Sequence, residues 1–198
     1  MDPYSYFPAG FAHKYAILEW RHALAILKGE FPEQFLDLCH VLSAFELRES
    51  SITQGGGGKS LVSGFLDGEL TKRGWAEKGF DTATVIDGVT YETPTHKVDC
   101  VKGRVALDIE WNNKTEFYDR DLNNFRMLHT LGAISVGIIV TRDSGLQTAV
   151  FNPLNIGSKY GASTTHLNKL IPKINGGGAG GCPLLVIAVK SGAFVAGK

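Results

Sequence analysis

Apolar and polar residues alternate most regularly between positions 105 and 111. Large apolar side chains occupy the odd positions of this stretch, and Asp108 and Glu110 stand at even positions. A repeat of two residues is typical of a β-strand with one buried face. The pattern therefore predicts a strand from which both carboxylates project on the same side.

A second strand is expected directly before the first, over residues 97–101. Lys102-Gly103-Arg104 between them suits a tight turn, so the two strands can form a hairpin that brings Asp99 close to Asp108 and Glu110. Neighbouring carboxylates resist joint ionisation unless a cation neutralises them, and hard oxygen ligands favour magnesium or manganese. These three acids are the candidate catalytic and metal-binding residues. The alternative interpretation is a solvent-exposed face of an antiparallel strand.

The remaining pattern predicts five helices and four further strands. The residue before the fifth helix, Ser163, suits its N-cap. Asp87-Gly88 is a strong hairpin signal, and residues 133–141 are continuous in β-branched residues, as in a strand covered on both faces. A strand, a helix and a buried strand in succession form a βαβ unit with a parallel pair. The expected helices are 13–28, 32–47, 61–73, 118–131 and 164–174, and the expected strands are 82–86, 89–91, 133–141 and 182–189.

Composition indicates one globular domain over residues 1–198. Hydrophobic residues make up 43% and charged residues 20% of the chain, which is ordinary for such a domain. No apolar run is long enough to span a membrane, and the N-terminus lacks the form of a signal peptide, so we expect a cytoplasmic protein without a membrane partner. The cysteines, Cys39, Cys100 and Cys182, have no paired spacing and are expected to be reduced thiols.

The charges are distributed unevenly although the formal net charge is zero. No acidic residue follows Asp143, and five lysines give the last 55 residues a charge of +5. This asymmetry suits a surface that binds a polyanion, and solvated surface lysines are the alternative. The glycine-rich stretch before Lys59 is not a P-loop, because Thr53 stands where that motif needs glycine. It is better suited to approach a phosphate backbone through its amides and Lys59.

An acid on one strand, Asp-x-Glu on the next, and then a helix and a buried strand resemble the PD-(D/E)xK nuclease core. More closely, residues 98–113 and 119–142 resemble the BglII and BstYI restriction endonucleases, and the active-site pattern is similar to that of BamHI. The resemblance implies an α/β fold with a restriction-endonuclease-like core, in which helices flank a mixed central β-sheet. It also implies the activity of a type II restriction endonuclease, a site-specific endodeoxyribonuclease.

The resemblance carries over residue by residue at the acidic positions. Asp99 matches the first metal-binding aspartate of the family, and Asp108 matches the next acid, which is glutamate in the closest relatives. Glu110 falls where many of these nucleases have lysine. The proline that precedes the first aspartate is absent, because Val98 stands there. The implied cofactor is Mg²⁺, held by Asp99 and Asp108, with the role of Glu110 left open between base and ligand.

The implied substrate is double-stranded DNA, cut by a homodimer at a short palindrome that contains GATC in the closest relatives. A cognate DNA methyltransferase is the implied functional partner. Asparagine can pair with adenine and arginine with guanine, which suggests Asn113 and Arg142 as base contacts. Ser163 and Thr164 fall in the segment that matches the recognition loop of the family, with helix capping as the alternative. Lys59 and Lys169 are expected to contact phosphates.

Two other functions remain open at this point. One is a different nuclease with the same core, such as a repair or junction-resolving enzyme, which would cut at lesions or branches rather than at a fixed sequence. The other is a DNA-binding protein without catalysis, in which the acidic hairpin is only a surface.

Overall fold

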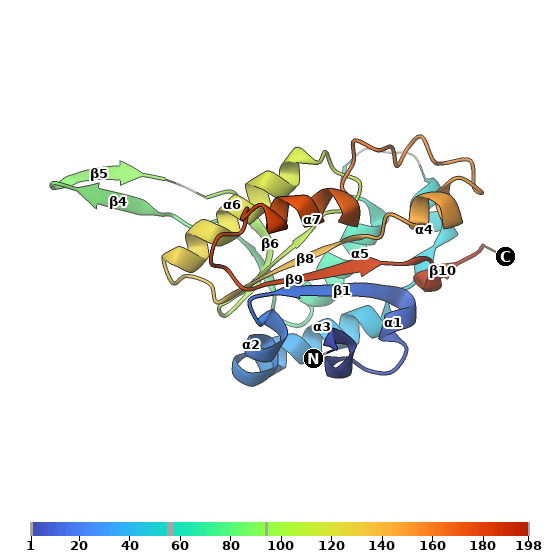
Figure 1. The fold of residues 1–198 in the computed structure, drawn as a ribbon, viewed down its shortest axis with the longest axis horizontal. Helices are drawn as coiled ribbons and strands as arrows, with labels where there is room; N and C mark the ends of the chain where they lie inside the picture. The colour runs from blue at the N-terminus through green and yellow to red at the C-terminus, as the bar shows by residue number, and fades with distance from the viewer. Residues whose placement is uncertain (1, 55–57, 94, 198) are drawn as a thin grey trace.

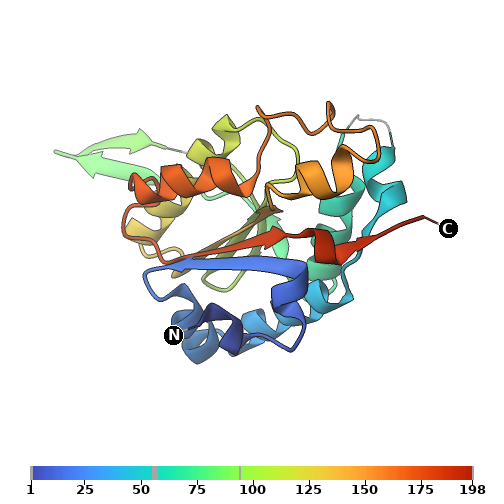
Figure 2. The same ribbon diagram turned by 45° about the vertical axis from the view of Figure 1, so that its right-hand side comes forward.

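The computed structural model describes residues 2–54, 58–93 and 95–197. Its centre is a six-stranded mixed sheet with helices on both faces (Figures 1 and 2). This arrangement confirms the α/β, restriction-endonuclease-like core predicted from the sequence. The strands, in order across the sheet, are β1 (Tyr15–Trp20), β9 (Leu184–Val189), β8 (Val136–Arg142), β7 (Val105–Ile109), β6 (Val98–Lys102) and β3 (Ala76–Lys78).

The middle of the sheet is parallel and its two sides are antiparallel. β7, β8 and β9 run in the same direction, whereas β1 and β6 run antiparallel to their neighbours. Helix α6 (Glu116–Thr130) connects β7 to β8, which is the predicted βαβ unit. Every residue of β8 is buried, as its continuous β-branched sequence indicates. The hairpin of β6 and β7 that carries the candidate acids is also formed as predicted.

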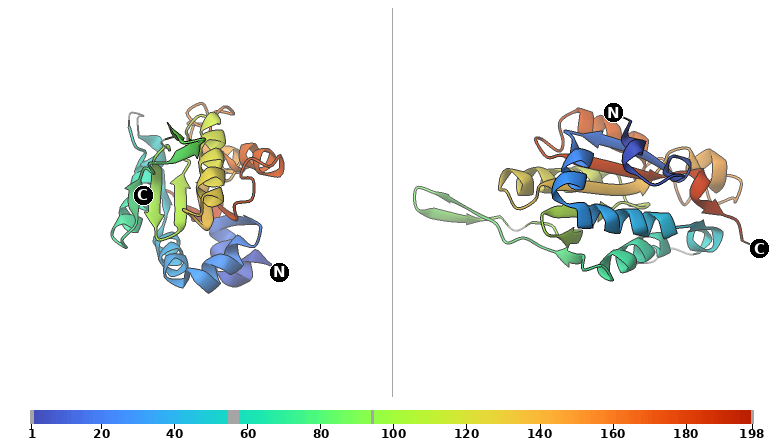
Figure 3. Two further views of the ribbon diagram at one scale, coloured as in Figure 1. Left: turned by 90° about the vertical axis from the view of Figure 1, so that its left-hand side faces the viewer. Right: turned by 90° about the horizontal axis from the view of Figure 1, so that it is seen from below.

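Helices cover the two faces of the sheet in separate layers (Figure 3, left). α2 (Ala23–Glu30), α3 (Pro32–Ala44) and α5 (Leu61–Thr71) pack on one face, and α6 and α7 (Leu167–Asn175) on the other. Within the described residues, no helix is long and apolar enough to cross a membrane. The short elements are α1 (Phe11–Lys14), α4 (Glu49–Thr53), single turns at Pro3–Tyr6, Gln147–Phe151 and Ser191–Ala193, and β2 (Leu47–Arg48) paired with β10 (Phe194–Val195).

The predicted helix over residues 13–28 is wrong, because most of its first half is strand β1. Tyr15 and Ile17 enter the core on one face of the sheet, and Ala16 and Leu18 pack on the other. A strand with apolar residues on both faces has no clear repeat of two, so its sequence fits a helix equally well. Pairing with β9 favours the strand, because β9 provides hydrogen-bond partners for the backbone of β1 at the edge of the sheet.

Two helices differ from the prediction in detail. α5 buries Val62, Leu66 and Leu70 in the core, whereas Leu61 and Phe65, which helical spacing predicts on the same apolar side as Leu66 and Leu70, are 51% and 40% exposed. α7 begins at Leu167 after the N-cap residue His166 rather than after Ser163. Ser163 lies three residues before that N-cap, too far to cap the helix, and the Asn168 N–H in the first turn donates instead to the Ser144 hydroxyl at 3.1 Å.

A long hairpin leaves the body of the protein beyond β3. β4 (Ala83–Ile86) and β5 (Val89–Glu92) pair antiparallel around Asp87-Gly88, as predicted. The hairpin projects from one end of the molecule (Figures 1 and 3, right).

Candidate active site

The backbone pairing of β6 and β7 ends at Cys100 and Leu107, and aspartate side chains take over beyond this point. The Asp99 N–H donates to Oδ1 of Asp108 at 2.9 Å, and the Ile109 N–H donates to Oδ2 of Asp99 at 2.9 Å. Each carboxylate therefore bonds to the backbone of the opposite strand. This reciprocal arrangement fixes the two aspartates side by side at the end of the hairpin.

The carboxylates of Asp108, in β7, and of Glu110, directly after β7, are buried rather than solvated. Asp108 and Glu110 are each 2% exposed, so the interpretation of these two acids as a solvent-exposed face is wrong. Helix α6 covers this side and contributes a third buried acid, Asp121, also 2% exposed. Arg120 lies beside the group, with Nη2 at 2.7 Å from Oδ1 of Asp121 and 3.5 Å from Oε1 of Glu110.

The cluster of Asp108, Glu110 and Asp121, here called the buried acid cluster, opposes its own ionisation. Burial is the largest cause that raises the pKa of each member, and the charge of Asp121 raises the pKa of the other two further. The pKa of Glu110 rises to about 9, although the Asn113 amide, whose Nδ2 donates to Oε2 at 2.9 Å, and Arg120 both oppose the rise. The cluster thus contains more carboxyl groups than its neighbours could neutralise if all three were ionised.

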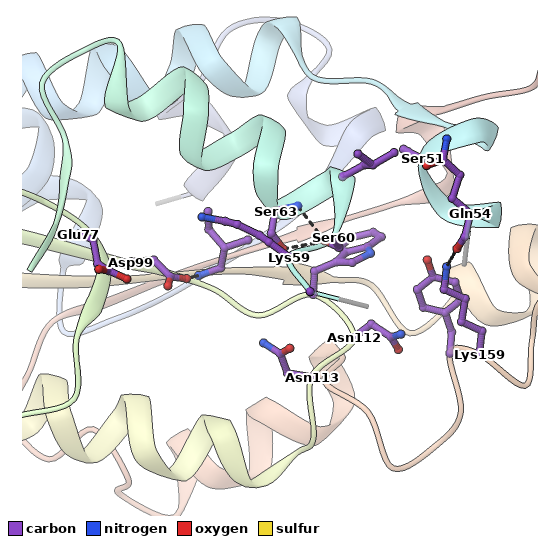
Figure 4. A pocket seen from close by; sticks show the side chains of 15 residues that line it. Ser51, Gln54, Lys59, Ser60, Ser63, Glu77, Asp99, Asn112, Asn113 and Lys159 are labelled. Atoms are coloured by element: carbon purple, nitrogen blue, oxygen red, sulfur yellow. Dashed lines mark hydrogen bonds between the residues drawn. The ribbon is translucent and has the colours of Figure 1, made fainter. Parts of the chain in front are cut away.

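Asp99 lines a polar cavity of about 660 Å³ (Figure 4). Burial raises the pKa of its carboxyl, while the Ile109 N–H and the charge of Lys59 lower it. Lys59 also lines the cavity, and its Nζ lies 2.7 Å from Oδ2 of Asp67 on α5. The N-terminus of α5 opens into the same cavity, where Ser60 caps the helix and Ser63 donates its N–H to the Ser60 hydroxyl at 3.0 Å.

The donor chemistry of this region fits a hard divalent cation. Carboxylate oxygens outnumber basic groups, and Oδ2 of Asp121 has no hydrogen-bond partner among the described residues. Within residues 2–54, 58–93 and 95–197, no three His, Cys, Asp or Glu side chains lie close enough together to bind one metal ion. The predicted convergence of three acidic ligands is therefore not seen. Mg²⁺ commonly takes one or two protein carboxylates together with water and phosphate oxygens, so a pair such as Asp99 and Asp108 could hold it.

Three of the predicted DNA contacts lie close together, and one of them, Asn113, lines the cavity. Asn113 follows β7, and its carbonyl accepts the Thr165 N–H at 2.8 Å. Thr164 forms a β-bridge with Lys114, and Ser163 next to it is exposed. The loop after β7 and the segment before α7 are thus paired, which brings Asn113, Ser163 and Thr164 together.

Arg142 is placed differently from the prediction that it contacts guanine directly. Its side chain is buried, with the residue 1% exposed, and Nη2 donates to the Tyr160 carbonyl at 3.1 Å and to Oγ1 of Thr164 at 2.9 Å. The guanidinium also lies over the rings of Phe151 and Tyr160. In this position Arg142 holds the loop of residues 160–164 from behind instead of reaching the groove of a DNA duplex.

The basic C-terminal segment does not form one continuous surface. Lys159 lines the cavity, where its Nζ donates to the carbonyls of Ile52 and Gln54. Lys173 pairs with Asp119 at 2.6 Å, and Lys169 is exposed on α7. The lysines of this segment therefore lie at separate places on the molecule. The reason is that the chain crosses the molecule as helix α7 and strand β9.

Sequence reasoning missed two acids near the site, Asp67 on α5 and Asp121 on α6. A signal for Asp121 was present, because it falls in the apolar stripe of α6 with Tyr118, Leu122 and Phe125. An acid in a buried stripe is costly unless it is paired or serves a site. The sequence around Asp67 carries no comparable signal, and only the fold brings its carboxylate to Lys59.

The fold and this site define an α/β nuclease core, with paired acids at the end of a hairpin beside a polar cavity. The family model described as Restriction endonuclease BglII/BglIII matches residues 15–189. The chain belongs to this family and is a type II restriction enzyme, a site-specific endodeoxyribonuclease whose substrate is DNA. No curated protein matches the chain.

Proposed function

We propose that this endonuclease makes Mg²⁺-dependent double-strand cuts at a short palindromic site that contains GATC. The observation that supports the proposal most directly is the reciprocal bonding of Asp99 and Asp108 beside the cavity. Two carboxylates fixed side by side suit a shared cation, and preorganised charge of this kind is the largest usual contribution to catalysis. The palindrome, its GATC core and the homodimer come from the family resemblance.

Asp99 and Asp108 are the residues that would hold Mg²⁺. When bound, the ion offsets negative charge that develops on the scissile phosphate and makes water more acidic. The pKa of about 9 keeps the Glu110 carboxyl protonated near neutral pH, so Glu110 would orient the attacking water, or deprotonate it where a bound cation favours the carboxylate. Asn113 holds Oε2 of Glu110 in place. Arg120 neutralises part of the remaining charge of the buried acid cluster.

The cavity supplies the groups that contact DNA. The N-terminus of α5, Ser63 and Lys59 present hydrogen-bond donors and positive charge that suit a phosphate. Asn113, Ser163 and Thr164 read base edges from the paired loops, and Arg142 positions Thr164 rather than touching a base. Lys169 contacts a phosphate farther along the duplex.

Digestion of a plasmid of known sequence, followed by sequencing of the ends, tests the proposal. With Mg²⁺ we expect discrete fragments whose ends share one palindrome, and with EDTA no cutting. Methylation of that palindrome is expected to protect the plasmid, as a cognate methyltransferase would protect host DNA. Cuts confined to branched or damaged DNA would instead indicate a junction-resolving or repair enzyme.

The variant Asp108→Ala tests the assignment of the metal-binding aspartates. We expect cleavage to fall by about 1,000-fold or more, because charge stabilisation in the transition state is lost. Binding to a short duplex that contains the site, measured by fluorescence anisotropy, should persist. Glu30→Gln, at an exposed acid of α2, serves as the control and should cut like the wild type. Normal cleavage by Asp108→Ala would overturn the assignment.

A further inference from the structure

Arg120, on helix α6, is held in one position by three neighbours. Its Nε and Nη2 lie 2.8 Å and 2.7 Å from Oδ1 of Asp121, and Nη2 lies 3.5 Å from Oε1 of Glu110. The guanidinium also lies over the ring of Phe117, at 4.4 Å from the ring centroid. These contacts restrict a side chain that otherwise has many rotamers, so its positive charge has a fixed place beside the buried acid cluster.

The guanidinium of Arg120 keeps donors that these contacts do not use. Asp121 occupies Nε and Nη2, and no hydrogen bond among the described residues involves Nη1. The side chain is 30% exposed, so a ligand can reach it. The planar fork of an arginine matches the oxygens of a phosphate, and such charge-assisted bonds are short and strong. Arg120 can therefore bind an anionic ligand through Nη1 while Asp121 keeps the other two nitrogens in place.

The charge of Arg120 acts on every carboxyl at the end of the hairpin. It lowers the pKa of four acids: Asp99, Asp108, Glu110 and Asp121. Lys59 is another base in this region, and its Nζ lies 2.7 Å from Oδ2 of Asp67. A cation changes the pKa of an acid only within electrostatic range, so the guanidinium is near both aspartates that are assigned to Mg²⁺.

Cleavage of DNA requires more positive charge at this place than the ion supplies. The formal charges of one Mg²⁺ and two aspartates cancel, so the charge of the scissile phosphate is left unmatched. Further negative charge develops on that phosphate in the transition state. A second cation, fixed beside the ion before the substrate arrives, would offset this charge without rearrangement.

We propose that Arg120 is a catalytic residue whose guanidinium contacts a non-bridging oxygen of the scissile phosphate, and that Asp121 positions it. The place of this phosphate rests on the proposed function, because it follows from Mg²⁺ held by Asp99 and Asp108. The contact strengthens as negative charge grows on the phosphate, so it lowers the barrier rather than only improving affinity. Arg120 thus has a role in the reaction beyond neutralising the buried acid cluster.

Single-turnover cleavage with Mg²⁺ tests the catalytic role through Arg120→Gln. The substrate is a duplex that contains the site found by plasmid digestion. We expect the rate of cleavage to fall by about 100-fold or more, because a charge-assisted contact of the transition state is lost. Arg126→Gln is the matched control, since it removes an exposed arginine from the same helix, and it should cut like the wild type. Unchanged cleavage by Arg120→Gln would overturn the proposal.

A double substitution separates a catalytic role from a merely neutralising one. Arg120→Gln leaves the carboxylate of Asp121 buried without its partner, which can itself disturb the fold. Arg120→Gln combined with Asp121→Asn removes both charges, and circular dichroism and the thermal midpoint show that it is folded. We expect this variant to cut as slowly as Arg120→Gln. Recovery of wild-type cleavage would overturn the proposal, because Arg120 would then serve only to neutralise Asp121.

Binding to a modified duplex tests the contact itself without cleavage. One duplex keeps the scissile phosphate and a second carries an uncharged methylphosphonate in its place, and fluorescence anisotropy in EDTA gives both dissociation constants. We expect the ratio of modified to unmodified dissociation constant to be at least about fivefold larger for the wild type than for Arg120→Gln, because only the wild type has a guanidinium contact to lose. Arg126→Gln should give the ratio of the wild type.

Equal ratios for the wild type and Arg120→Gln would overturn the contact between Arg120 and the phosphate. This outcome is distinct from a failure of the proposed function, because the binding measurements use neither metal nor cleavage. Cutting that proved independent of Mg²⁺, or a site that is not a palindrome, would contradict only the proposed function.

Discussion

Glu110 shows how strongly position in the fold changes the chemistry of one residue. Its carboxyl is buried behind β7, near the charge of Asp121, and its pKa rises from the ordinary value of 4.5 to about 9. A group whose pKa is raised on folding stabilises the native state while it is protonated. The contribution of Glu110 is therefore fully present below pH 4.5 and is lost as the pH rises toward about 9. Near neutral pH, the buried Glu110 therefore makes the native state less stable than it would be at low pH.

Replacement by a side chain that does not titrate should remove this cost. We expect Glu110→Gln, without metal, to match the wild type in stability near pH 4 and to exceed it by about 1 to 3 kcal/mol near pH 9, because no buried charge has to form. Urea unfolding in EDTA at several pH values measures the difference. Glu30→Gln is the exposed control and should show no such dependence. Parallel stability curves for Glu110→Gln and the wild type would contradict the burial argument.

At the scale of elements, the close contact between α6 and β8 brings the α6 member of the buried acid cluster next to the other two acids. Gly137 of β8 lies under Phe125 of α6, and a Cβ added at Gly137 would come within 2.6 Å of the ring. The missing side chain therefore lets α6 lie close to the sheet. Asp121 and Arg120 on the same helix reach Glu110 because of this close approach.

Gly137→Ala should consequently destabilise the protein by about 1 to 3 kcal/mol through overpacking. Combination with Phe125→Leu, which makes room for the methyl group, should recover part of the loss. Gly29→Ala in α2 is the control, since no heavy atom lies within 4 Å of the position of its added Cβ. That change should be neutral or stabilise the helix by up to about 1 kcal/mol. Denaturant midpoints of the single and double variants give the comparison, and a neutral Gly137→Ala would show that α6 can shift freely.

At the scale of the whole molecule, the proposed metal site would couple Mg²⁺ binding to folding. A cation that binds only the native state stabilises it by about 2.7 kcal/mol at 100 times its dissociation constant. For a chain of this length each kcal/mol raises the midpoint of thermal unfolding by roughly 2 to 4 °C. Stability and Mg²⁺ concentration are therefore expected to rise together.

Thermal unfolding with increasing Mg²⁺ at pH 8 should show this rise in the wild type, and EDTA should reverse it. Asp99→Asn and Asp108→Asn should abolish the response, because each removes one of the two carboxylates assigned to the ion. Asp119→Asn, at an exposed acid of α6, should retain it. An Mg²⁺ response that survives both active-site substitutions would place the ion elsewhere.

Much of the active site could be predicted from local sequence alone. The repeat of two around Asp108 and Glu110, the turn at Gly103 and the order of strand, helix and buried strand all appear in the structure as expected. These features depend on residues that are close in the chain, where alternation of side chains directly reflects the geometry of the backbone. The pattern therefore determined the hairpin, the βαβ unit and the pairing of Asp99 with Asp108.

Only the tertiary structure decided which surfaces cover these elements. The sequence pattern does not reveal that α6 seals Asp108 and Glu110 from water, that Arg142 lies behind its loop, or that residues 15–20 join the sheet as a strand. Each outcome depends on a neighbour that is distant in the chain, and a local repeat shows that a face is buried without identifying what buries it. Burial then sets the pKa values and the accessible groups, so the chemistry of the site is determined by the fold as much as by the acids themselves.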